Sequence, residues 1–161
     1  MQTLFKATLA AALSMAAIVP AMADDEPILV HSQAAFAQWQ ADVTNSLDRR
    51  LVSAERSSRL TPESGIVQLR FTLDENGKPQ GIRTVTSSGD WSTDRVAISA
   101  VRGLNQLDEA PVANVQGQTF QANIIFAKSE AQRDKLAAKL ARMETARLAR
   151  GETSGVISFG L

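Results

Sequence analysis

The side chains that could carry chemistry in this sequence are two adjacent acid pairs, a run of serines and a single histidine. They are Asp74-Glu75, Asp108-Glu109, the serines between Ser87 and Ser92, and His31. Neighbouring carboxylates can act as general acid and base, and a serine becomes a nucleophile when a base removes its proton. Both acid pairs lie in segments of turn composition, where carboxylates are solvated, and no general base accompanies any serine. These residues therefore predict no enzyme active site.

The composition excludes several other kinds of site. The chain has 161 residues, with 17 Lys and Arg against 17 Asp and Glu, and contains no Cys. Without cysteine there are no disulfides, thiolate nucleophiles or zinc fingers, and one histidine cannot build a multi-histidine metal site. A pI near 6.6 lacks the basic character of a dedicated nucleic-acid binder. We expect a binding or structural module without cofactor, metal or nucleic-acid partner.

Residues 1–23 have the layout of a secretory signal peptide. Lys6 precedes an uncharged apolar run from Ala7 to Val19, and the small residues Ala21 and Ala23 frame a cleavage site. This run of about 13 residues is shorter than the roughly 20 that a membrane-spanning helix needs. An uncleaved membrane anchor is the alternative. We expect a periplasmic mature chain, residues 24–161, without an integral membrane span.

The mature chain divides into a helical segment, a central domain and a tail. In residues 24–60, apolar side chains recur every three or four positions from Phe36 to Leu51. This spacing predicts a helix from about Gln33 to Ser57, with Ser32 as its N-cap. Residues 129–161 contain a run of helix formers and then a glycine-containing end, which we expect to be a loose terminus.

Residues 61–128 contain three segments with strand character. Apolar and polar residues alternate from Gly65 to Leu73 and again from Thr119 to Phe126, as in strands with one buried face. Asn76-Gly77 favours a tight reversal after the first strand, because glycine accepts a positive φ. A return strand from Gln80 to Ser87 completes a hairpin, and its irregular alternation predicts a bulge.

A short helix connects the hairpin to the last strand. Apolar residues from Val96 to Leu104 fall on one face, Ser92 is placed as the N-cap, and Gly103 lies near the end. A right-handed crossover from the second strand to the third puts the first strand in the middle of the sheet. The sequence therefore predicts an α+β fold. Its parts are a small three-stranded antiparallel sheet (β-β-α-β), an N-terminal helix packed on one face, and a basic amphipathic helix at the C-terminus.

A series of short motifs runs through residues 65–126. They are Gly65-Ile66-Val67 before the first strand, the Asp74-x-x-Gly77 turn, Ser87-Ser88-Gly89 after the second strand, the helix pattern Asp94-x-x-Ala97-x-x-Ala100-Val101, the downstream Pro111 and the alternating last strand. None is specific alone, but their order and spacing together resemble the C-terminal domain of TonB-family energy transducers. TolA-type C-terminal domains are the nearest alternative family.

The resemblance implies how such a domain binds its partner. In the TonB family, the domain engages a short extended segment of an outer-membrane transporter by β-strand addition. The third strand is an edge here, with unpaired backbone N–H and C=O groups. The predicted partner-binding positions are Gln118, Thr119, Gln121, Asn123 and Ile125. Two alternatives remain: the chain's own tail covers this edge, or two copies of the chain exchange strands as a homodimer.

The sequence departs from a complete transducer at its N-terminal side. A family transducer couples to a proton-driven motor through a Ser and a His in a membrane helix, which a proline-rich spacer follows. Here Ile18 stands four residues after Ser14, and only Pro27 and Pro62 lie between the signal segment, residues 1–23, and the first strand. We therefore expect the binding half of the family function in transmembrane transport, without the energy-coupling machinery.

The C-terminal helix supports a second functional hypothesis. Between Lys128 and Arg150 basic residues outnumber acidic ones, and Lys135, Lys139 and Arg142 stand close to the apolar side. A positively charged amphipathic helix can lie on an anionic membrane surface or along a partner. The alternative function is an envelope adaptor or structural protein that acts through this helix and has no role in energy transduction. The simpler structural interpretation is a solvated helix that caps the sheet.

Overall fold

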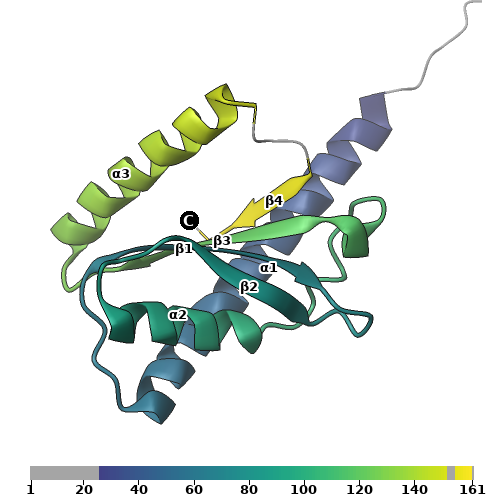
Figure 1. The fold of residues 1–161 in the computed structure, drawn as a ribbon. Helices are drawn as coiled ribbons and strands as arrows, with labels where there is room; N and C mark the ends of the chain where they lie inside the picture. The colour runs from purple at the N-terminus through teal and green to yellow at the C-terminus, as the bar shows by residue number, and fades with distance from the viewer. Residues whose placement is uncertain (1–25, 152–154, 161) are drawn as a thin grey trace, which may run out of the picture.

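The structure is a computed structural model that describes residues 26–151 and 155–160. Within these ranges the chain folds as three α-helices and one four-stranded sheet (Figure 1), so the α+β class is as predicted. The elements in chain order are α1 (Glu26–Ser58), β1 (Gly65–Leu73), β2 (Pro79–Thr86), α2 (Trp91–Arg102), the 3₁₀ turn η1 (Val115–Gly117), β3 (Thr119–Phe126), α3 (Glu130–Ala149) and β4 (Val156–Phe159).

The predicted signal segment and its cleavage positions Ala21 and Ala23 lie outside the described residues. Of the helices in the described part of the chain, none is long and apolar enough to cross a membrane.

The sheet has the strand order β2-β1-β3-β4. β1 is antiparallel to both β2 and β3, which confirms its predicted place between them, whereas β4 runs parallel to β3. The predictions of a three-stranded antiparallel sheet and of a loose C-terminus are therefore wrong: the sheet is mixed and has four strands, and the C-terminal segment forms β4. β4 forms because Ile157 and Phe159 alternate with more exposed neighbours and bury their side chains in the core, where they are 8% and 3% exposed.

The β1–β2 hairpin has the predicted turn and irregular register. Gly77 adopts φ 70 in the turn, where its N–H donates to the carbonyl of Asp74 at 3.0 Å. The register slips between Arg70 and Thr72, opposite the part of β2 that contains Gly81, whose φ is 62. A residue with positive φ in the longer strand is how a bulge absorbs an extra residue.

α1 begins at Glu26, earlier than the predicted start, so Ser32 lies within the helix and is not its N-cap. Pro27 is compatible with this start, because the first helical N–H groups have no intrahelical acceptor and proline lacks the N–H. The predicted apolar face is confirmed at Trp39, Val43 and Leu47, which are all buried. The indole Nε1 of Trp39 donates to the carbonyl of Gln106 at 3.0 Å and thereby fixes α1 to the loop after α2.

The N-cap of α2 is Asp90, which corrects the predicted cap Ser92. The carboxylate of Asp90 accepts hydrogen bonds from the backbone N–H of Thr93 at 2.7 Å and from the hydroxyl of Ser92. These bonds stabilise the charged form, with the Ser92 bond the largest cause, and lower the pKa of Asp90 from 3.8 to about 2.

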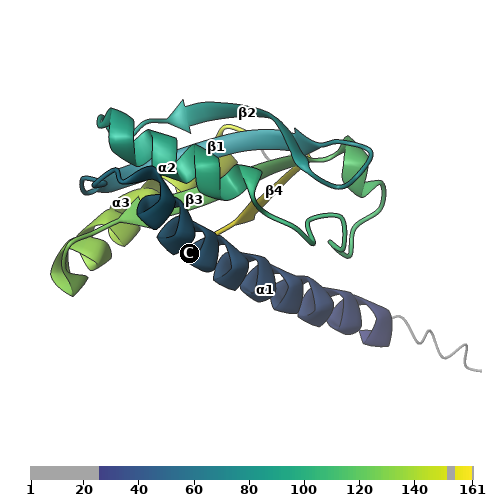
Figure 2. The same ribbon diagram turned by 90° about the horizontal axis from the view of Figure 1, so that it is seen from below.

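The helices form layers on the two faces of the sheet (Figures 1 and 2). α1 and α2 lie together on one face, as predicted for the N-terminal helix, and the hydrophobic core lies between them and the sheet. Its aromatic centre includes Phe71 stacked on Phe120, with a centroid separation of 5.7 Å, and Phe159 edge-on to Trp39 at 6.3 Å. α3 covers the opposite face.

Candidate partner-binding edge

β4 covers only the first half of the outer edge of β3. The parallel pairing runs from Thr119 opposite Val156 to Ala122 opposite Phe159. From Asn123 to Phe126, no strand of the described chain lies beside β3 on this side. The predicted third-strand edge is thus covered by the tail in one half, and in the other half, here called the open half, no strand of residues 26–151 or 155–160 covers it.

α1 closes the far side of β4. The side-chain Nε2 of Gln40 donates to the carbonyl of Ser158 at 2.7 Å, and the backbone N–H of Gly160 donates to Oγ1 of Thr44 at 3.1 Å. Two side chains of α1 therefore occupy backbone groups that a short edge strand would otherwise present to solvent.

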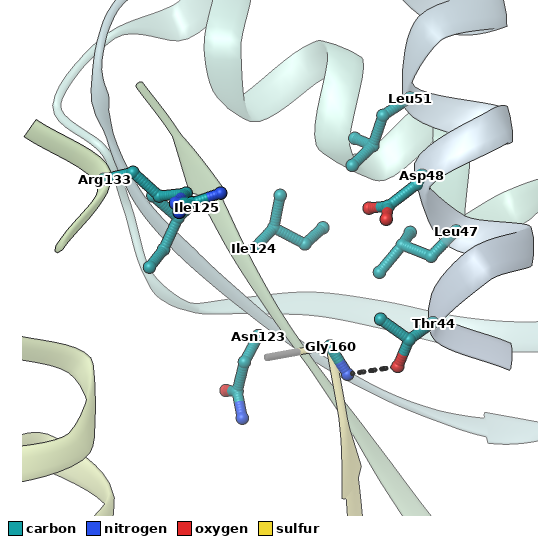
Figure 3. A pocket seen from close by; sticks show the side chains of 9 residues that line it. All are labelled: Thr44, Leu47, Asp48, Leu51, Asn123, Ile124, Ile125, Arg133 and Gly160. Atoms are coloured by element: carbon teal, nitrogen blue, oxygen red, sulfur yellow. Dashed lines mark hydrogen bonds between the residues drawn. The ribbon is translucent and has the colours of Figure 1, made fainter. Parts of the chain in front are cut away.

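Beyond the end of β4, a pocket of about 260 Å³ opens between α1 and β3. Figure 3 shows Ile124 directed toward Leu47 and Leu51 of α1, whereas Ile125 and Arg133 lie on the other side of β3. The residues that line the pocket are Thr44, Leu47, Asp48, Leu51, Asn123, Ile124, Ile125, Arg133 and Gly160.

Two of the predicted partner-binding side chains are buried under α3. Gln121 is 0% and Asn123 6% exposed, so both faces of β3 are buried here, whereas its alternation predicted one buried face. Glu144 of α3 accepts hydrogen bonds on Oε1 from Nε2 of Gln121 and from Nε2 of Gln68, both at 2.8 Å. Its Oε2 forms a 2.8 Å ion pair with Arg147. This face of the sheet is polar because α3 supplies a carboxylate that satisfies it.

The remaining predicted positions fall at opposite ends of β3. Gln118 and Thr119 are half-buried at the covered end, where the N–H of Thr119 donates to the carbonyl of Gly155 at 3.0 Å. Ile125 is half-buried at the open end and lines the pocket together with Asn123.

Sequence reasoning missed the α1 side of the pocket. Its contributors are Thr44, Leu47, Asp48 and Leu51. The helical periodicity identified Leu47 and Leu51 as apolar-face residues, but periodicity does not say which edge of a sheet a helix lies along. Long-range packing alone brings this face to the open half of β3.

The three basic residues of α3 that the sequence singled out are on its solvent side. Lys135, Lys139 and Arg142 are all exposed, whereas Leu140 is 4% exposed and Met143 is half-buried against the sheet. The main apolar side of α3 is therefore occupied by the protein itself, which agrees with the interpretation of a helix that caps the sheet.

The candidate catalytic groups are engaged in turns and caps. Oδ1 of Asp74 accepts from the backbone N–H of Asn76 at 2.9 Å and of Lys78 at 2.8 Å within the hairpin turn. In the serine run, the hydroxyl of Ser88 donates to Oδ1 of Asp94 at 2.8 Å. In the ranges that the structure describes, no group of three His, Cys, Asp or Glu side chains is placed to hold a metal ion.

The four-stranded sheet with helices on both faces defines the class of this molecule as a small α+β domain, and β4 covers only part of the β3 edge. Residues 56–127 match the family described as Gram-negative bacterial TonB protein C-terminal, a protein-interaction domain. This part of the chain is a TonB C-terminal domain, as its motifs predicted. Neither the curated proteins nor the solved structures gave a match. Most of α1, and all of α3 and β4, lie outside the matched residues.

Proposed function

We propose that this protein is a periplasmic binding module that captures an extended segment of a cell-envelope partner as a strand along the open half of β3. The observation that carries the proposal is the stretch from Asn123 to Phe126, which pairs with β1 on one side and has no strand of the described residues on the other, in a domain of a protein-interaction family. Unpaired N–H and C=O groups of an edge strand are a template for an incoming chain.

The open half is a better docking place than the half that β4 covers. A partner strand along Thr119–Ala122 would have to displace β4 and expose Ile157 and Phe159. Exposing two such side chains costs roughly 3–6 kcal/mol, at about 1.5–3 kcal/mol each. An added strand on Asn123–Phe126 pays no such cost, so we expect β4 to stay in place during binding.

The other edge of the sheet is less suited to pairing. β2 is irregular where it contains Gly81, and it carries the exposed side chain of Arg83. Bulges and charged side chains are the devices by which edge strands resist pairing. We therefore assign the partner to β3.

The proposed partner is a TonB-dependent outer-membrane transporter, and the proposed process is transmembrane transport. Its support is the TonB C-terminal family of residues 56–127. A homodimer formed through the same edge is an alternative occupant. The envelope-adaptor function through Lys135, Lys139 and Arg142 remains a prediction that rests on the exposure of these side chains.

Site-specific photo-crosslinking in the periplasm tests this proposal. A photoreactive residue in place of Asp48, at the pocket, should crosslink to an outer-membrane transporter. The matched control is the same residue in place of Arg49, which is exposed on α1 but does not line the pocket. Equal capture from both positions, or capture of only a second copy of this chain from Asp48, would contradict the transporter proposal.

A further inference from the structure

We infer that α1 makes this edge selective for side chains: an aliphatic side chain of the added strand enters the pocket between α1 and β3. The inference rests on the proposed function, because it concerns the strand that would pair with the open half of β3. Its occupant is an extended peptide segment of a partner, continuous with the existing β3–β4 pairing.

The position of the pocket follows the path of β4. Gly160 follows the last residue of β4, lines the pocket, and lies so close to β3 that a Cβ on it would stand 2.4 Å from the carbonyl oxygen of Asn123. A strand that continues this pairing beyond Asn123 would run through the pocket. Its side chains would alternate between the α1 face and the α3 face.

The chemistry of the α1 face is apolar. Leu51 is half-buried and offers apolar surface to a side chain on this face, and Leu47 and Ile124, each 2% exposed, form the buried floor behind it. Asp48 lines the same pocket and is exposed. An acidic side chain on the α1 face would lose hydration and meet the like charge of Asp48, and both effects are unfavourable. The basic residue of the pocket, Arg133, lies on the other side of β3. A volume of about 260 Å³ admits an aliphatic side chain together with its backbone.

The side chains that would give this selectivity lie outside the residues that match the TonB C-terminal family. The α1 residues of the pocket, from Thr44 to Leu51, all precede the matched residues 56–127. β3 supplies the backbone N–H and C=O groups that would pair with the added strand, and α1 supplies the side chains that would contact a side chain of that strand. The backbone of an edge strand pairs with any sequence, so such a side-chain contact is what distinguishes one partner segment from another.

Disulfide trapping on the full chain measures this selectivity. Since the sequence contains no cysteine, Ala127→Cys places a single thiol just after β3 at an exposed position. The probes are synthetic threonine-rich seven-residue peptides with a terminal cysteine and with valine, leucine, aspartate or tryptophan at alternate positions. The fraction trapped is measured against increasing reductant. Thr84→Cys, exposed on β2, is the control for the opposite edge.

The valine and leucine peptides should be trapped about tenfold more strongly than the aspartate peptide, the scale on which an apolar pocket discriminates. Leu51→Phe should shift preference toward smaller side chains, and Leu51→Ala toward larger ones. Val52→Phe adds the same ring at a neighbouring residue of α1 that is 48% exposed and outside the pocket, and should leave the preference unchanged.

The outcomes separate the two proposals. If the fraction trapped at Ala127→Cys is the same for every peptide side chain and is unchanged by both Leu51 variants, the selectivity of α1 is overturned. Strand addition would still hold in that case. Trapping no stronger than at Thr84→Cys would overturn strand addition at this edge, and the selectivity with it. Circular dichroism establishes that each Leu51 variant is folded, and either variant alone suffices for the test.

Discussion

Asp90 shows at the scale of a single residue how local geometry departs from local sequence. Both Asp90 and Ser92 are N-cap residue types, and their order along the chain does not say which one caps the N-terminus of α2. In the structure the Ser92 hydroxyl is itself a donor to the Asp90 carboxylate, so the two residues act together at one cap.

The lowered pKa of Asp90 makes part of the stability dependent on pH. Its folded value of about 2 lies below 3.8, so the stabilisation is complete above the unfolded pKa and is lost as pH falls through the folded one. Asp90→Asn retains a capping side chain without the charge. We expect this variant to have a lower free energy of unfolding than the wild type at pH 7. The difference should disappear as the pH falls from about 4 to about 2.

Urea unfolding at successive pH values measures that gap. Glu109→Gln is the control, since Glu109 is an exposed carboxylate that takes no part in the cap of α2. A gap between wild type and Asp90→Asn that stays constant from pH 7 to pH 2 would show that the carboxylate charge does not stabilise the cap.

At the scale of elements, α3 is held to the sheet by a carboxylate. Removing Glu144 leaves Gln68, Gln121 and Arg147 without one of their partners in a partly buried setting. Breaking such an arrangement from one side typically costs about 3 kcal/mol. We therefore expect Glu144→Ala to lower the free energy of unfolding by about 3 kcal/mol in urea titrations.

Lys139→Ala is the matched control on the same helix, because Lys139 is exposed. Its effect should stay within about 0.5 kcal/mol, as for most surface substitutions. Similar losses for the two variants would mean that the polar contacts of Glu144 do not hold α3 in place.

Elements with strong local signals were predictable from the sequence. β1, β3 and the turn at Gly77 follow from alternation and turn chemistry, and the structure confirms them. β4 was missed because four residues carry a weak local signal, and their pairing with β3 is a long-range, parallel contact. The alternation in β3 predicted only one buried face, because polar residues such as Gln121 and Asn123 are mostly exposed in proteins. Only the placement of α3 explains their burial.

At the scale of the whole molecule, a TonB C-terminal domain carries a helix before it and a helix and strand after it. The tail fills half of the β3 edge, and α1 borders the other half (Figures 1 and 3). The candidate site is therefore a product of the assembled chain. The sequence motifs indicated the sheet edge and the kind of partner, but only the fold shows which part of the edge is open.

Amide hydrogen exchange of the full chain, alone and with the partner segment identified by crosslinking, tests the central claim most directly. The account predicts that amides of β3 between Asn123 and Phe126 that point away from β1 gain protection. It also predicts that Thr119–Ala122, paired with β4, keep theirs, and that β2 does not change. Protection gained on β2 instead, or lost protection in β4 on binding, would contradict strand addition at the open half of β3.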